Sequence, residues 1–433
     1  MPIPSSSLSS PQDRSESLPC FSHIIVLAGS PDPDLVDPNI LLTHEFDRND
    51  TLSNVTAVLE QYMAKSNWNQ LKDKGPQVTV QRVILRDWPT ILATLIELRA
   101  TLAAAIPVSD LRTLPLLVFN LCDGSELDGY PGGTVPQSLE ENRFVFTGSM
   151  ASFYAITTPK TLLKTYLQHA HVPTSEFVYM NLATLDQDAN SAHALLGSPV
   201  IVKPDVSYAS LGITSTSVTR SPAETANQSR QILAEFPLAG CFVERFLPGR
   251  EFTALVCGHY EMGTEGKGGV QVYPVAERVF REGLVAEERF LAFDRYWDGW
   301  TIEGDRPPAD TPGYYKYEHA PMAWQQKLMQ VALDAYVACH GTGYGRVDMR
   351  TMSTEKCDVF VLEVNANCGL TFDETSSLGE ILRLSKVDPM RFLSDIIVQS
   401  LERASVMPNL GRDDSAREAL AQSKQVAAPI QEI

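Results

Sequence analysis

The chain has 433 residues, and its 35 Lys and Arg against 53 Asp and Glu give a formal net charge of −18. This balance argues against duplex nucleic acid or an anionic membrane as the main partner, because both attract a net basic surface. It is compatible with a small anionic ligand in a local basic pocket. The length favours two or three domains of ordinary globular composition.

The seven cysteines are scattered and never spaced C-x-x-C, and the eight histidines form no H-x-x-x-H pair. A disulfide framework and the common zinc sites are therefore not expected, and a reducing compartment is favoured. No apolar run reaches the 18 residues that a membrane-spanning helix needs. Residues 1–20 are rich in Ser and Pro without the apolar core of a signal peptide, so we expect a disordered lead-in and a cytoplasmic protein.

The first part of the chain alternates short apolar strands with helical segments. Strands are expected at 24–27, 78–85 and 114–121, and helices at 52–63 and 91–105. Buried strands that alternate with helices are typical of a parallel sheet in an α/β layer. We therefore predict an N-terminal α/β domain over residues 21–149.

A second part begins at a predicted helix in which Thr158 is the N-cap and Pro159 lies in the first turn. Strands follow at 177–180 and 200–203, and the segments 241–244 and 251–256 alternate like paired strands. Helices are expected at 328–339 and 389–404, and the Pro- and Gly-rich loop 303–320 resembles an active-site cover. We predict a central subdomain at 150–240, a C-terminal subdomain at 241–405 and a flexible tail at 406–433.

The segments 345–349 and 358–365 carry a set of polar residues at strand spacing. Alternation places Phe360, Leu362 and Val364 on one face of the second strand and Glu363 and Asn365 on the other. Arg346 and Asp348 are also two residues apart, so pairing of the strands would gather all four polar side chains. Oxygen donors beside a cation suit Mg²⁺ bound to phosphates, although a solvated strand face with a surface ion pair has the same pattern.

Three further segments favour an anion-binding site. Lys203 ends a buried strand, where an ammonium group is costly without an anion. The small-residue loop 207–212 offers backbone amides to phosphates, although a plain turn would have the same composition. The segment 243–252 combines two acids with apolar residues, which suits either a purine and a ribose or a charged hairpin.

Seven segments in order resemble the ATP-grasp ligases, most closely the D-alanine–D-alanine ligase branch, between about residues 119 and 371. They are Phe119–Gly124, Phe146–Ser149, Pro159-Lys160, Val202–Pro204, Val243-Glu244 with Gly249–Phe252, Gly345–Asp348 and Leu362–Asn365. The resemblance implies an α/β ATP-grasp fold, in which an N-terminal parallel α/β domain precedes two α+β subdomains that clamp ATP.

The resemblance also implies the roles of individual residues. ATP-binding residues would be Lys160, Lys203, Glu244, Phe246, Leu247 and Glu251, with Lys316 as a lid lysine. Glu251 matches the ribose-binding acid, and Asp348, Glu363 and Asn365 match the ligands of Mg²⁺, for which Mn²⁺ can substitute. The catalytic residues would be Arg346, which steadies the acyl phosphate, together with Lys203, Ser210 and Gly369.

The implied reaction joins a small carboxylic acid, such as an amino acid, to an amine through an acyl phosphate and releases ADP and phosphate. A thiol ligase, a small-molecule kinase and a silent ATP-binding protein are the alternatives, and the family allows a homodimer. The first turn offers no residue that matches the family's substrate-gripping acid, although Glu126 and Asp128 could face a substrate. Cys368 also stands where the family has Pro, which leaves the D-alanine specificity open.

Overall fold

The computed structural model describes residues 20–30, 48–49, 51–61, 79–85, 87–106, 113–127, 129–208, 210–260, 269–292, 314–373 and 376–406. The predicted N-terminal lead-in up to residue 19, Asp128, the loop 303–313 and the tail from residue 407 lie outside these ranges. Within the described residues, no helix is both long and apolar enough to cross a membrane.

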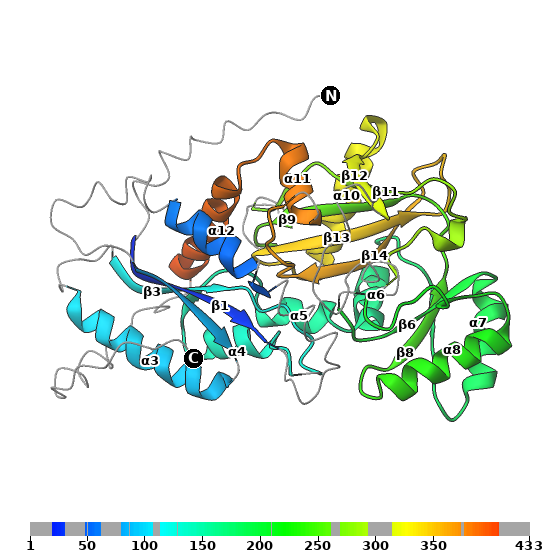
Figure 1. The fold of residues 1–433 in the computed structure, drawn as a ribbon, viewed down its shortest axis with the longest axis horizontal. Coiled ribbons are helices and arrows are strands. Elements are labelled where there is room, and N and C mark those ends of the chain that lie inside the picture. Colours follow the sequence, from blue (N-terminus) through cyan, green and yellow to red (C-terminus); the bar gives the residue numbers. More distant parts are fainter. Residues whose placement is uncertain are drawn as a thin grey trace.

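A four-stranded parallel sheet forms the first layer, in the order β2-β1-β3-β4, as the alternating sequence predicts (Figure 1). Its strands are β1 (Cys20–Gly29), β2 (Thr79–Leu85), β3 (Thr113–Asn120) and β4 (Val145–Phe146). Both faces are covered, as is usual for parallel sheets. The helical segment 51–61 packs on one face, and α3 (Trp88–Ala105) and α4 (Thr134–Glu141) pack on the other.

The residues of β1 show why the sheet is buried on both sides. Ile24 and Val26 belong to the core that contains the segment 51–61, whereas Ile25 and Leu27 belong to the core of α3 and α4. Side chains of a strand alternate between faces, so a continuous apolar run is what two covered faces require.

The second sheet is antiparallel, in the order β5-β8-β6-β7, and lies at the lower right of Figure 1. Two helices cover it, and Ser221 begins the second helix with a capping box to Glu224. The elements are β5 (Phe177–Tyr179), α7 (Leu185–Leu196), β6 (Val200–Pro204), β7 (Val218–Thr219), α8 (Pro222–Glu235) and β8 (Cys241–Arg245).

The third sheet is antiparallel, in the order β12-β11-β9-β13-β14, with β10 beside β9. Its strands are β9 (Glu251–Cys257), β10 (Gln271–Val272), β11 (Ala276–Phe280), β12 (Tyr315–His319), β13 (Tyr344–Thr351) and β14 (Val359–Ala366). The helices that pack on it are α5 (Ala151–Thr157), α6 (Lys160–His169), α10 (Met322–Ala338), α11 (Ser377–Ser385) and α12 (Pro389–Val406).

The pairing of β8 with β9 that the sequence suggested is wrong. β8 pairs with β5 and β6, whereas β9 pairs with β11 and β13 in the third sheet. The turn at Pro248 and Gly249 therefore connects two sheets. The predicted boundary between residues 240 and 241 falls before β8, which is still a strand of the second sheet, because strand partners are set by contacts distant in sequence.

The start of α6 also differs from the prediction. Pro159 is the N-cap, and Thr158 instead ends α5. Asp205, which follows β6, accepts hydrogen bonds from the Thr161 amide at 2.7 Å and the Thr161 hydroxyl at 3.0 Å. The capping carboxylate comes from a segment 44 residues away, so local sequence does not reveal it.

Candidate active site

A cavity of about 370 Å³ lies where the three sheets meet, and almost every residue predicted for the site lines it. Lys316 is the exception. The predicted residues that line the cavity are Lys160, Lys203, Ser210, Glu244, Phe246, Leu247, Glu251, Arg346, Asp348, Glu363, Asn365 and Gly369. Their positions agree with one shared site, and their individual roles stay predictions.

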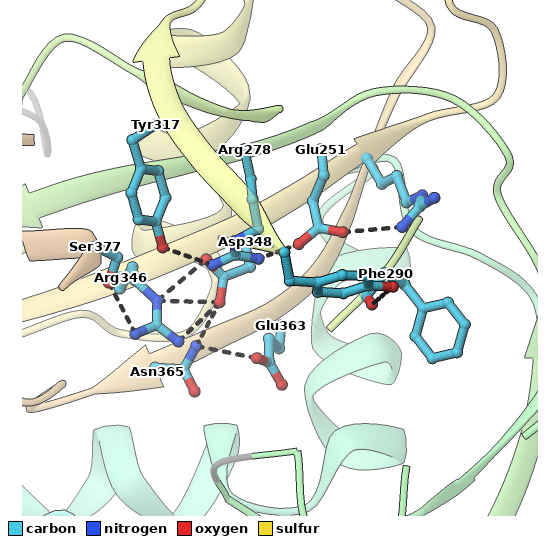
Figure 2. Close-up of polar contacts among 11 residues, drawn as sticks. Glu251, Arg278, Phe290, Tyr317, Arg346, Asp348, Glu363, Asn365 and Ser377 are labelled. Carbon is cyan, nitrogen blue, oxygen red and sulfur yellow. Dashed lines mark hydrogen bonds and ion pairs between the residues drawn. The ribbon is translucent and has the colours of Figure 1, made fainter. Parts of the chain in front are cut away.

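The polar cluster of β13 and β14 occupies one wall of the cavity (Figure 2). The strands pair antiparallel, with Arg346 opposite Asn365 and Asp348 opposite Glu363. The Asn365 side-chain amide donates to Asp348 Oδ2 at 3.1 Å and to Glu363 Oε1 at 3.4 Å. The pairing on which the sequence argument depended is therefore present, and the side chains converge.

The assignment of Leu362 to the opposite face from Glu363 is wrong. A β-bulge leaves Leu362 without a partner, because Met349 pairs with Val361 and Asp348 with Glu363. An extra residue in one strand shifts its alternation by one position. Leu362 therefore lines the same cavity as Glu363, while Val361 and Val364 are both buried in the core.

Asp348, Glu363 and Asn365 fit a hard divalent cation such as Mg²⁺, which takes carboxylate and amide oxygens. Within the described residues, no group of three or more His, Cys, Asp or Glu side chains could hold a metal ion. Asp348, Glu363 and Asn365 therefore stay the predicted donors for a metal ion in this cavity.

Arg346 binds the carboxylate of Asp348. Its Nε donates to both oxygens of Asp348, at 3.1 and 3.0 Å, and its Nη1 donates to the Ser377 hydroxyl at 3.3 Å. Burial raises the pKa of Asp348, but Arg346 and Arg278 outweigh burial and lower it. The carboxylate is therefore ionised at neutral pH, as a metal ligand must be.

The two predicted lysines enter the cavity from α6 and β6. Lys160 donates from Nζ to the carbonyl oxygen of Ser207 at 2.8 Å and to its hydroxyl at 3.1 Å, and burial lowers its pKa. Lys203 lies 2.6 Å from Glu244, on the neighbouring strand β8. Both ammonium groups can thus meet an anion beside the loop that follows β6.

Lys164 is a member of this cluster that sequence reasoning missed. Its ammonium group is fully buried and lies 2.6 Å from Glu244, which therefore sits between two lysines. Burial raises the pKa of Glu244, but Lys164 and Lys203 together lower it to about 2. Lys164 is four residues after Lys160, and this spacing on one helix face could have revealed it.

Glu251 takes part in a row of three charges across the third sheet. It pairs in register with Arg278 of β11 and Arg350 of β13, and each guanidinium group binds one of its carboxylate oxygens. The rings of Tyr315 and Tyr317 lie beside Arg278, at 5.1 and 5.4 Å, which suits a cation–π contact. Neither arginine was predicted, because each lies apart from the matched segments.

Phe246 and Leu247 lie in the connection between β8 and β9. Phe246 packs edge-on against Phe290, with ring centroids 6.0 Å apart, and Arg350 lies 5.2 Å from the centre of its ring. This end of the cavity is therefore apolar and aromatic, as a planar base requires.

The structure does not bring Lys316 to the cavity. Its side chain is 70% exposed and forms a surface ion pair with Glu318. Neighbouring Tyr315 and Tyr317 line the cavity instead, because alternation in β12 directs Lys316 to the other face. Nothing in this arrangement supports its role as a lid lysine.

Glu126 is also not among the residues that line the cavity. One of its carboxylate oxygens accepts hydrogen bonds from the amides of Gly132 and Thr134, at 2.7 and 2.9 Å, and from the Thr134 hydroxyl at 2.7 Å. These contacts hold Glu126 to its own loop, and none of them supports a role toward a substrate.

The fold and the cavity together define an ATP-grasp ligase. A family model described as "D-ala D-ala ligase C-terminus" matches residues 166–398, more than half of the chain. The chain therefore belongs to the D-alanine–D-alanine ligase family. It is an ATP-dependent ligase that forms carbon–nitrogen bonds, and the thiol-ligase, kinase and silent alternatives are not favoured.

Among curated relatives, a D-alanine–D-alanine ligase of Nitrosococcus oceani is 27% identical over 277 residues, which cover 64% of this chain and 75% of that protein. A D-alanine–D-alanine ligase of Desulforudis audaxviator is 28% identical over 242 residues, with coverages of 55% and 68%.

Solved structures share the fold over most of their length. The D-alanine–D-alanine ligase of Bacillus anthracis complexed with ATP has a TM-score of 0.55 at 16% identity, with 89% of this chain and 99% of that one covered. The VanG D-Ala:D-Ser ligase of Enterococcus faecalis has a TM-score of 0.57 at 15% identity, with 88% and 99% covered.

Proposed function

We propose that this protein joins two small amino acids in an ATP- and Mg²⁺-dependent reaction, with D-alanine, named in its relatives, as the first substrate to test. The observation that carries the proposal is the convergence of Arg346, Asp348, Glu363 and Asn365 in the cavity that also receives Lys160 and Lys203. A cytoplasmic site of action and a homodimer stay predictions.

ATP would lie between the second and third sheets. Phe246 and Leu247 would contact the base, and Lys160 and Lys203 would bind phosphate oxygens. Glu251 keeps acceptor capacity for a ribose hydroxyl, since each carboxylate oxygen can accept more than one hydrogen bond. Ser210 belongs to the loop after β6, at the phosphate end of the cavity.

Asp348, Glu363 and Asn365 would hold the magnesium ion, with Mn²⁺ as a substitute. When bound, the metal neutralises phosphate charge and so favours transfer of the terminal phosphoryl group to a substrate carboxylate. The acyl phosphate formed in this way has a good leaving group, and attack by an amine then releases phosphate.

Arg346 would stabilise the negative charge that develops on the carbonyl oxygen when the amine attacks the acyl phosphate. Its guanidinium group already faces the cavity between Asp348 and Ser377, so little reorganisation is needed at the moment of reaction. Ser377 begins α11, and the partial positive charge of a helix N-terminus suits a substrate carboxylate beside it. Gly369, eight residues before Ser377, also lines the cavity.

The first experiment measures ADP and phosphate release from ATP with Mg²⁺ and D-alanine, followed by pooled L- and D-amino acids. We expect Asp348→Asn and Glu363→Gln to lower turnover by about 100-fold or more, because each removes a carboxylate that would hold the metal ion, whose positive charge stabilises the anionic transition state. Glu355→Gln is the matched control, since that acid is exposed in the connection between β13 and β14. Wild-type turnover in both site variants would overturn the metal assignment.

Lys203 gives a separate test of nucleotide binding. We expect Lys203→Ala to weaken the affinity for ATP by about 10-fold or more, because a charge-assisted hydrogen bond to phosphate is lost. Isothermal titration with a non-hydrolysable ATP analogue measures the affinity. An unchanged dissociation constant would limit Lys203 to its ion pair with Glu244.

A further inference from the structure

The parallel sheet has a topological switch point that opens into the cavity. The chain leaves β1 toward the helical segment 51–61 on one face and leaves β3 toward α4 on the other. β1 and β3 are neighbours, so their carboxyl ends border a crevice, which is where open α/β sheets bind ligands. Ala28 and Asp123, at these two strand ends, both line the cavity.

Asp123 is held at this crevice beside two aromatic rings. The Tyr130 hydroxyl donates to Asp123 Oδ1 at 2.9 Å, and the rings of Tyr130 and Tyr208 lie 5.5 Å apart. The Tyr130 ring fits against Gly29, where an added Cβ would come within 2.8 Å of it. The side chains of Asp123, Tyr130 and Tyr208 all line the cavity, so a carboxylate and two aromatic rings meet there.

Hydrogen bonds from its own loop and from residues that pack on or follow the third sheet hold the backbone around Asp123. The Asn367 side-chain amide donates to the carbonyl oxygens of Asn120 and Cys122, at 3.1 and 3.0 Å, and the Tyr154 hydroxyl also donates to that of Cys122. The Gly124 amide donates to the Pro131 carbonyl at 2.9 Å. This support fixes where the carboxylate of Asp123 lies relative to the third sheet.

Three of the other acids that line the cavity are paired with cationic side chains, unlike Asp123. Asp373, a further lining acid, accepts a hydrogen bond from the Ser376 amide at 3.0 Å. Glu244 and Glu251 are paired with lysines and arginines, and Asp348 with Arg346. Glu363 contacts Asn365 in the predicted metal set.

Within the described part of the chain, Asp123 instead has a neutral hydroxyl as its side-chain partner. Burial raises its pKa to about 6 against the opposing effects of Tyr130 and Arg346, which shows a carboxylate that a further cation would stabilise.

We propose that Asp123, with the ring faces of Tyr130 and Tyr208, receives the ammonium group of an amino-acid substrate, an inference that rests on the proposed function. A carboxylate pairs with an ammonium group by charge-assisted hydrogen bonds, and the rings add cation–π attraction. Asp123 thus takes the place of the acid that the first turn does not supply, and it selects amino acids over hydroxy acids of the same shape.

The test compares binding of an amino acid with binding of the matching 2-hydroxy acid, in the presence of Mg²⁺ and a non-hydrolysable ATP analogue. The amino acid is the one that stimulates ADP release, so D-alanine would be compared with D-lactate. We expect Asp123→Asn to weaken amino-acid binding at least 10-fold and to leave hydroxy-acid binding within about 2-fold. Asn keeps an acceptor for Tyr130, and unchanged affinity for the analogue verifies the fold.

Two further variants complete the test. Glu141→Gln removes an acid from the exposed face of α4 and should leave the ratio of the two affinities unchanged. Tyr130→Phe should lower the ratio by less than Asp123→Asn, since the ring stays and the carboxylate loses its hydrogen bond. Equal ratios in wild type and Asp123→Asn would overturn the inference alone. If no amino acid stimulates ADP release in the wild type, the proposed function and this inference both fail.

Discussion

Glu244 is a buried carboxylate whose surroundings change the role that its sequence position suggested. Resemblance placed it among the ATP-binding residues, yet its two oxygens each lie 2.6 Å from a lysine, Lys164 or Lys203. A carboxylate buried in this way holds the lysines in place and offsets their charge. It would therefore act on the nucleotide mainly through the position of Lys203.

Replacement of Glu244 by Gln should destabilise the protein strongly. It would leave two ammonium groups without their acid, and loss of one partner of a buried ion pair costs about 3–5 kcal/mol. Glu318→Gln, which breaks the exposed pair with Lys316, is the matched control and should change stability little. Urea denaturation measures both free energies of unfolding, and equal losses would refute the distinction.

The contacts of Glu244 with the two lysines also predict how the free energy of unfolding depends on pH. The folded-state pKa of Glu244, about 2, is below its ordinary value of 4.5, so the unfolded chain takes up the proton first. The stability that this group contributes is complete above pH 4.5 and is lost as the pH falls from 4.5 toward 2. We expect the wild-type free energy of unfolding to fall more steeply in this window than that of Glu244→Gln; parallel curves would contradict the assignment.

Three adjacent strands carry the charge row of Arg278, Glu251 and Arg350. Both arginines bind the one acid, and the Nε and Nη2 atoms of Arg350 are buried without a hydrogen-bond partner among the described residues. Buried donors without partners are costly, whereas a single arginine–carboxylate pair is balanced. The row therefore has two positive charges for one negative charge, and a single arginine would be enough to balance Glu251.

The two ends of this row should respond differently to substitution. Arg350→Met leaves a balanced pair and removes the unpartnered donors, so we expect a change in the free energy of unfolding of less than about 1 kcal/mol. Glu251→Gln leaves two arginines facing each other and should cost about 3–5 kcal/mol. Chemical denaturation of both variants measures the difference. A loss in Arg350→Met as large as that in Glu251→Gln would show that Arg350 is needed by the sheet itself.

The strands that carry the site could be predicted from sequence. Which face of the sheet each of their residues occupies could be predicted only in part. Alternation in 358–365 predicted the strand and its polar face, because side-chain direction follows from local backbone geometry. The bulge at Leu362 depends on how β14 pairs with β13, and no local pattern records that register. The partners of β8 and β9 were missed for the same reason.

Contacts between distant segments account for the other differences. Arg278 was not predicted, because its role follows from pairing with Glu251 on another strand. Asp123 lies within a segment that matched the family, but its position beside Tyr130 and Tyr208 follows from the folding of two loops onto one crevice. The sequence thus predicted which kinds of residue form the site and only part of their arrangement.

At the scale of the whole molecule, the cavity depends on contacts that join the parallel sheet to the third sheet. Arg403 of α12 donates to the carbonyl oxygens of Gly148 and Phe146, at 3.0 and 2.5 Å. Asn367, just after β14, reaches Asn120 and Cys122 at the end of β3. Through Asn367, the strand that carries the predicted metal ligands and the strand that ends near Asp123 are tied together.

Loss of the Asn367 contacts should therefore impair turnover more than nucleotide binding. Asn367 has a φ of 52°, a left-handed conformation that Gly also adopts, so Asn367→Gly removes the side chain without backbone strain. Three buried hydrogen bonds are lost, to the Asn120 and Cys122 carbonyls and from the Ser149 amide, and a destabilisation of about 1–3 kcal/mol is expected. The residues proposed to bind ATP lie in the second and third sheets, in the connection between β8 and β9 and in α6, so affinity for a non-hydrolysable ATP analogue should stay within about 3-fold.

Turnover with the amino-acid substrate should fall at least 10-fold, since a displacement of about 1 Å at a reacting group costs about 100-fold. Asn181→Gly, at an exposed position after β5, is the matched control and should keep wild-type turnover. Steady-state kinetics and isothermal titration measure the two quantities in the same preparations. Loss of nucleotide affinity and turnover in equal proportion would mean that Asn367 supports the ATP site itself, whereas loss of turnover alone would mean that the active site is completed by the docking of the parallel sheet.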